Sequence, residues 1–156
     1  MAGSILGTEV TRTEDPELLL GRATFVGDLD LDSSLHLAFV RSEYAHARLA
    51  SVDTSGAASV SGVVGAFTAA DLQLPGYHGL AKVHDHFART PLATDRVRYV
   101  GDVIAVVAAE TATAARDGAA LVSVQYEELP CIVEPEDAFA PGAELIFPEH
   151  GNNVAL

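Results

Sequence analysis

Two histidines two positions apart, His84 and His86, have the spacing in this chain that most suggests a chemical site. Side chains at i and i+2 of an extended segment lie on the same side of the backbone, so both imidazoles would face one way. Imidazole is a common zinc ligand, and a structural zinc ion takes four ligands. The pair is therefore a candidate half of a zinc site, which His78 or a carboxylate would complete. The alternative, an exposed polar loop, is favoured because isolated His-x-His patterns are common.

The chain has one cysteine, Cys131, so it can form neither an intrachain disulfide nor a zinc cluster of thiolates. The residues around it, 129–133, are apolar, and a free cysteine in such a setting packs as a small hydrophobic residue. A catalytic role would require a nearby base and a lowered thiol pKa. We expect Cys131 to serve in packing.

Other familiar catalytic and ligand-binding motifs are missing. The glycines Gly62 and Gly65 lack the spacing and the Lys-Ser/Thr pair of a phosphate loop, and the chain has no G-x-S-x-G sequence. Asp28, Asp30 and Asp32 alternate as calcium ligands do, but the glycine and terminal glutamate of an EF-hand loop do not follow. We interpret these aspartates as a solvated turn. No catalytic, cofactor-binding or metal-binding residue is therefore assigned.

Polar side chains gather around a predicted turn at residues 43–46. This cluster has two interpretations, a hydrogen-bonded corner inside the domain or a surface that docks onto a partner. Charged and aromatic groups at strand ends are typical interface anchors. If the docking interpretation holds, the interface candidates here and at the entry to a predicted central strand are Arg41, Tyr44, His46, Arg48, Gly101 and Asp102.

Length and composition limit the classes of protein. A chain of 156 residues is about one domain and buries roughly 70% of its unfolded surface. The net charge of -13 repels phosphate backbones and anionic lipids, so neither nucleic acid nor a membrane surface is an expected partner. The longest apolar run, residues 103–109, is too short to span a bilayer, and the N-terminus lacks the pattern of a signal peptide. The expected location is the cytoplasm.

The second half of the chain has the clearest structural pattern. Residues 103–109 form a continuous apolar run, which is typical of a strand covered on both faces. Small residues then recur at helical spacing over 111–121, and alternation over 122–126 predicts another strand. Glycine inside a helix costs about 1 kcal/mol relative to alanine. We therefore expect Gly118 to lie at a tight contact.

The first half alternates less regularly. Alternation predicts a strand over 35–40, whose apolar residues on both faces suggest a central position in the sheet. A turn and a returning strand over 47–52 follow. We further predict short strands at 24–26 and 63–67, a helical turn at 68–71 and a long surface loop over 73–92.

Together these elements predict an α/β (α+β) domain with a mixed sheet and a few short helices packed on it. We divide the chain into an N-terminal leader, the domain itself and the start of a linker. Their expected ranges are 1–22, 23–145 and 146–156.

Short motifs stand in a fixed order along nearly the whole chain. They include RTED at 12–15, LLGRA at 19–23, VGD at 26–28, AHAR at 45–48, VRYVGD at 97–102 and YEELP at 126–130. In this order they resemble the opening of the molybdenum-containing large subunits of xanthine dehydrogenases, aldehyde oxidases and aerobic carbon monoxide dehydrogenases. The resemblance implies an α/β hammerhead fold. Asp102 departs from it, because the family is associated with Glu or Gln there.

The resemblance also implies a parent oxidoreductase that hydroxylates a substrate with oxygen from water. Electrons would pass from molybdopterin-bound molybdenum to iron–sulfur and FAD centres, which lie elsewhere in the enzyme. The molybdopterin-contacting segments and catalytic glutamate of the family would lie beyond Leu156, so no catalytic or cofactor residue is carried over and this chain alone is expected to be inactive. The implied partners are the molybdopterin-binding domains and the iron–sulfur and flavin subunits.

Two functions from different classes follow. The first is an N-terminal structural or assembly domain of a molybdenum hydroxylase large subunit. The second is a stand-alone small acidic binding module that reuses the hammerhead fold. Self-association into a homodimer is a further way for such a domain to cover surface that is normally buried.

Overall fold

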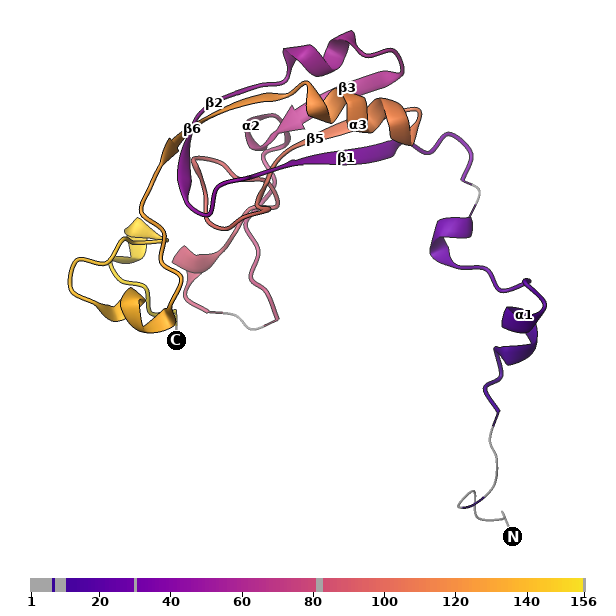
Figure 1. Cartoon of the computed structure of the whole chain (residues 1–156), viewed down its shortest axis with the longest axis horizontal. Helices are drawn as coiled ribbons and strands as arrows, with labels where there is room; N and C mark the ends of the chain where they lie inside the picture. Colours follow the sequence, from indigo (N-terminus) through magenta and orange to yellow (C-terminus); the bar gives the residue numbers. More distant parts are fainter. Residues whose placement is uncertain (1–6, 8–10, 30, 81–82, 156) are drawn as a thin grey trace. The chain divides into compact units, whose positions relative to one another are not determined.

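The computed structural model describes residue 7 and residues 11–29, 31–80 and 83–155 (Figure 1). The chain divides into two compact units, Met1–Ser34 and Leu35–Leu156. The first unit holds the helix α1 (Asp15–Leu19), with Pro16 in its first turn, and the 3-10 helix η1 (Val26–Asp28).

The strand predicted at 24–26 is wrong. The Asp28 carboxylate accepts a hydrogen bond from the Phe25 backbone N–H at 3.0 Å, and this local bond fixes a helical turn. Of the three alternating aspartates, Asp30 lies outside the described residues. Asp28 thus has a structural role in closing η1.

The second unit contains two three-stranded sheets, and each strand pairing is antiparallel. The first sheet has the order β1-β5-β3 (Figure 1). The second sheet has the order β4-β2-β6. Their strands are β1 (His36–Arg41), β2 (Ala47–Asp53), β3 (Val63–Thr68), β4 (Arg96–Val97), β5 (Val103–Ala109) and β6 (Ser123–Glu128).

The α/β fold class is confirmed, and the strands divide differently from the single mixed sheet that we expected. β1 and its successor β2 do not pair with each other, because β1 pairs with β5 and β2 pairs with β4 and β6. The turn between them therefore carries the chain from one sheet to the other.

β5 is the central strand of the first sheet, as its apolar run predicted. The central position that we also expected for the strand over 35–40 is wrong, because β1 lies at the edge of the sheet. Helix α3 (Ala112–Ala120) follows β5 and packs on one face of this sheet, where Val107 and Ala109 are fully buried. The Thr111 hydroxyl accepts the Ala114 N–H at 3.1 Å and caps the helix. Ile104 of β5 instead packs with Ala47 and Val97 of the second sheet. β5 thus contributes to both hydrophobic clusters.

Gly118 lies where α3 comes closest to the sheet, which confirms the expected tight contact. A Cβ atom at Gly118 would stand 3.0 Å from Cγ1 of Val107 and 3.0 Å from Cγ2 of Val63. These distances are shorter than ordinary van der Waals contact, and branched valine side chains have little freedom to move aside. Glycine at this position therefore sets the distance between helix and sheet.

The remaining elements are short. Helix α2 (Ala69–Leu72) starts at Thr68, whose N–H and hydroxyl both donate to the Asp71 carboxylate at 2.7 Å. The loop predicted over 73–92 contains a β-bridge between Tyr77 and Arg89. The second unit also has the 3-10 helices η2 (Ser55–Ser59), η3 (Asp85–Phe87), η4 (Pro135–Phe139) and η5 (Pro148–His150).

We predict that Gly118→Val destabilises the protein by about 1–3 kcal/mol, the range for overpacking a filled core. The added methyl groups would push α3 away from Val107 and Val63. Urea denaturation measures the free energy of unfolding, with Ala120→Val at the exposed end of α3 as control. Equal stability of the two variants would contradict the close-packing argument.

Candidate functional site

The end of β1 is tied to the entry of β5 by backbone hydrogen bonds. The Ser42 N–H donates to the Asp102 carbonyl and the Gly101 N–H donates to the Ser42 carbonyl, both at 2.8 Å. The exposed Arg41 guanidinium donates to the Gly101 carbonyl at 2.9 Å. Three of the six interface candidates, Arg41, Gly101 and Asp102, therefore lie together.

Tyr44 and His46 belong to a neighbouring group at the end of β6. The Tyr44 and Tyr126 rings lie 4.7 Å apart between centroids. His46 is only 2% exposed, and its Nδ1 lies 2.9 Å from the Pro130 carbonyl. Nε2 of His46 has no hydrogen-bond partner among the described residues. The His46 side chain is thus an internal part of the corner and not part of the domain's exposed surface.

Arg48 lies apart from both groups. It is exposed on β2, opposite Arg96 of β4 and Glu127 of β6. The structure therefore divides the six candidates into two neighbouring groups and one separate residue. Their role as an interface stays a prediction.

Ser42 is the member of this corner that sequence reasoning missed. It is 4% exposed, its hydroxyl donates to the Tyr44 carbonyl at 2.8 Å and accepts the Tyr44 N–H at 3.0 Å. Serine hydroxyls commonly bond to the backbone two residues ahead in turns. A serine directly before the predicted turn could therefore have been identified from the sequence as part of this corner.

One face of the first sheet is apolar and open. Leu37, Phe39 and Phe67 are 57%, 47% and 37% exposed. They pair in register with Ala108 and Val106 of β5 on the face opposite α3. We call the three exposed residues Leu37, Phe39 and Phe67 the open sheet face; Val106 and Ala108 between them are only 9% and 8% exposed. Exposed apolar groups gathered on one face are typical of a surface that binds another protein segment.

Three histidines form a cluster at the other end of the second unit. One ring nitrogen from each of His84, His86 and His150 lies within 4.8 Å of the others. The expected zinc partner His78 is not in this group, and its Nε2 instead lies 3.5 Å from the Asp85 carboxylate. The third imidazole comes from 64 residues along the chain, which no local pattern could indicate.

Polar contacts hold the segment that carries His150. Arg98 Nε donates to the Ile146 carbonyl at 3.1 Å, and the Arg98 guanidinium lies 4.6 Å from the centre of the Phe147 ring. The Asn153 side chain accepts the Ile146 N–H at 3.1 Å and donates to the Ala138 and Glu144 carbonyls at 3.2 and 3.0 Å. These bonds fix the path of the chain on both sides of His150.

Arg98 is in turn positioned by charge. Its guanidinium lies 3.6 Å from the Asp95 carboxylate, which also accepts from Arg96 Nε at 3.0 Å. Burial alone would raise the pKa of Asp95, but the hydrogen bond from Arg96 and the charges of Arg98 and Arg96 outweigh burial. The pKa of Asp95 therefore lies below its ordinary value.

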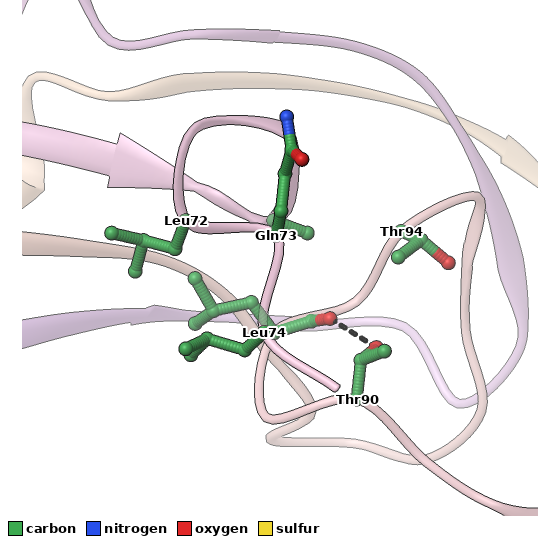
Figure 2. A pocket seen from close by; sticks show the side chains of 7 residues that line it. Leu72, Gln73, Leu74, Thr90 and Thr94 are labelled. Carbon is green, nitrogen blue, oxygen red and sulfur yellow. Dashed lines mark hydrogen bonds between the residues drawn. The ribbon is translucent and has the colours of Figure 1, made fainter. Parts of the chain in front are cut away.

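Two further features, Cys131 and a small pocket, lack the groups that a catalytic site would need. Cys131 is exposed rather than packed, because it follows the end of β6 in an irregular segment. A pocket of about 190 Å³ lies between α2 and the segment before β4 (Figure 2). The Thr90 hydroxyl donates to the Leu92 carbonyl at 2.6 Å at its edge, and the lining includes no acid or base.

The paired antiparallel sheets and α3 define the α/β hammerhead class of domain. Residues 20–130 match the family described as "Aldehyde oxidase and xanthine dehydrogenase, a/b hammerhead domain". The chain belongs to this family, as the order of its motifs predicted.

The relatives are components of oxidoreductases. The "6-hydroxypseudooxynicotine dehydrogenase complex subunit gamma" of Paenarthrobacter nicotinovorans is 40% identical over 96% of this chain, and the "Carbon monoxide dehydrogenase large chain" of Afipia carboxidovorans is 36% identical over 90%. Quinoline 2-oxidoreductase from Pseudomonas putida 86 covers 89% of this chain with a TM-score of 0.79 and 37% identity.

The chain spans about a fifth of the length of these relatives. The shares are 20% and 17% of the two curated relatives and 18% of the quinoline 2-oxidoreductase chain. Among the helices of the described residues, none has both the length and the apolar composition needed to cross a bilayer.

We predict that Asp95→Asn lowers the free energy of unfolding at pH 7 by roughly 1 kcal/mol, since Asp95 is half exposed and such pairs contribute little. A carboxyl with a lowered folded-state pKa stabilises the fold above its unfolded value of about 3.9 and loses this effect in acid. The difference between the proteins should therefore shrink as the pH falls below about 4.

Chemical denaturation at a series of pH values measures this difference. The control is Asp117→Asn, which changes an exposed carboxylate on α3. A difference that does not depend on pH would show that the Asp95 charge is not what holds Arg96 and Arg98.

Proposed function

We propose that this chain is a structural and assembly domain of a molybdenum hydroxylase large subunit. The observation that carries the proposal is the open sheet face, which leaves Leu37 and Phe39 about half exposed on a sheet whose other face is covered by α3. Membership of the family and a length of about one fifth of its relatives support the same proposal. The expected occupant of the open sheet face is the remaining part of the large subunit.

Apolar burial can supply the energy of this docking. Each square ångström of apolar surface removed from water contributes about 25 cal/mol. The face also carries two aromatic rings, Phe39 and Phe67, which bring a large apolar area to a contact. The face is therefore suited to a permanent contact within one subunit.

The redox centres of the parent enzyme are proposed to lie outside this chain. Iron–sulfur clusters are generally held by four cysteine thiolates, and this chain has Cys131 alone, exposed beyond β6. The residues present do not fit such a cluster. We propose that the domain contributes position and stability to the parent reaction, the oxidative hydroxylation of a substrate with water.

We predict that Leu37→Asp lowers binding to the rest of the large subunit at least about tenfold, equivalent to 1.4 kcal/mol. The new charge would lose its water at the centre of the apolar contact. The measurement is copurification and titration with the remaining large-subunit segment encoded in the same genome, supplied as a separate chain.

The matched control is Leu121→Asp, which makes the same chemical change at a leucine of similar exposure at the end of α3. Equal binding by both variants would refute docking through the open sheet face. If the wild-type domain binds no large-subunit segment at all, the stand-alone acidic module becomes the better description. A homodimer disrupted by Leu37→Asp would identify a second copy as the occupant.

A further prediction uses stability to distinguish interface residues from residues that are packed inside the domain. Arg41→Ala should change the free energy of unfolding by less than about 0.5 kcal/mol, because Arg41 is exposed. His46→Ala should cost roughly 1–3 kcal/mol, because His46 is buried against Pro130. Thermal or urea denaturation of the domain measures both values.

Binding to the large-subunit segment then tests the interface prediction itself. Arg41→Ala should weaken assembly without loss of stability, and Arg48→Ala, at the separate exposed position, is the companion variant. If neither arginine variant changes assembly, Arg41 and Arg48 are not part of an interface.

A further inference from the structure

We infer that His84, His86 and His150 form a binding site for a divalent transition metal ion, for which Zn²⁺ fits best. His86 lies in η3, and His84 directly precedes this helix. His150 is the last residue of η5. The ion would therefore join two segments that are far apart in the chain.

The three ligand nitrogens lie near enough to one another that side-chain rotation can bring them to the geometry of a bound ion. Zinc binds imidazole nitrogen at about 2.0–2.1 Å in a tetrahedral arrangement, which places ligand nitrogens roughly 3.4 Å apart. The three nitrogens lie within 4.8 Å of one another. His84 and His86 are exposed, so rotation of their side chains can supply the remaining approach.

The backbone around the cluster is already in place. The η3 and η5 helices contact each other, and the Phe87 ring packs 4.6 Å from His150 and 5.0 Å from Phe147. Arg98 and Asn153 hold the η5 side through the bonds described above. A site whose backbone segments are already held together loses less conformational entropy when the ion binds.

One hydrogen bond must be given up. Nδ1 of His84 accepts the His86 N–H at 3.2 Å, so the proton of the neutral His84 ring is on Nε2. A metal would bind Nδ1 in place of this bond, or Nε2 after the proton moves to Nδ1. The bond is long and exposed, so its loss costs little against three metal–nitrogen bonds.

The chemistry of the chain favours this class of ligand. Imidazole suits Zn²⁺, Cu²⁺ and Ni²⁺ rather than Mg²⁺ or Ca²⁺, which prefer oxygen. The net charge of -13 attracts cations in general. Three protein ligands leave a fourth position, which a water molecule would fill.

Packing of aromatic rings is the competing explanation for the cluster. The His84 ring lies 4.6 Å from His86 and 4.7 Å from His150, distances that any aromatic rings can adopt. A phenylalanine at position 150 would preserve this packing and remove a ligand. His150→Phe therefore separates the two explanations.

The experiment titrates ZnCl₂ into the complete chain, freed of any affinity tag and of bound metal, by isothermal titration calorimetry. We expect one ion per chain and a dissociation constant in the micromolar range or below. At about one hundred times that concentration, Zn²⁺ should raise the melting temperature by roughly 5–10 °C. Co²⁺ in the same site should show the visible absorption of a four-coordinate ion.

His150→Phe and His84→Ala should each abolish the one-to-one binding and the thermal shift, while His150→Phe keeps a metal-free melting temperature near that of wild type. His78→Ala is the nearby control, and it should bind Zn²⁺ as wild type does because His78 is outside the cluster. Weak binding at several sites, or a full response in His150→Phe, would overturn the inference.

Discussion

The packing of α3 against β5 is the contact on which the rest of the second unit depends. Gly118 lets the helix approach until Val107 and Val63 touch it, and β5 hydrogen-bonds to β1 on one side and β3 on the other. The residues of β5 are small or β-branched and almost entirely buried. A larger residue at Gly118 would displace the helix and expose the strand that aligns its two neighbours.

The central position of β5 also explains why one domain has both a closed core and an open surface. Alternate side chains of a strand point to opposite faces, so Val107 and Ala109 enter the core below α3 while Ile104 enters the core with the second sheet. Further along the same face, Val106 and Ala108 pair in register with Leu37, Phe39 and Phe67, which stay partly exposed. The first sheet thus has one face covered by α3. On its opposite face, the open sheet face is the part that the second sheet does not cover.

The sequence predicted the elements whose pattern is local. The β5 run, the α3 spacing, the tight contact at Gly118 and the start of α2 at Thr68 all depend on neighbouring residues, and the structure confirms them. The prediction of a strand at 24–26 failed because one hydrogen bond, from the Phe25 N–H to the Asp28 carboxylate, outweighs the weak strand preference of three residues.

Other features depend on contacts between distant segments, and no local pattern encodes them. Alternation marks 35–40 and 47–52 as strands but does not say that the turn between them changes sheet. Periodicity likewise gives no reason to pair His84 with His150 in place of the nearer His78. The apolar residues beside Cys131 suggested burial, but burial depends on what packs over a segment, and beyond Pro130 the chain has left the sheet.

The two ends of the second unit are held by different physical means, and this difference matters for their roles. The β5–α3 end is held by apolar packing, whereas the segment around His150 is held mainly by Arg98 and Asn153 through directed polar bonds. Directed bonds fix geometry well but contribute only about 1 kcal/mol each. Segments with few buried apolar contacts open before the core does. An ion held between η3 and η5 would raise the free energy of every state in which these segments separate, so the polar end is where a metal has most to add.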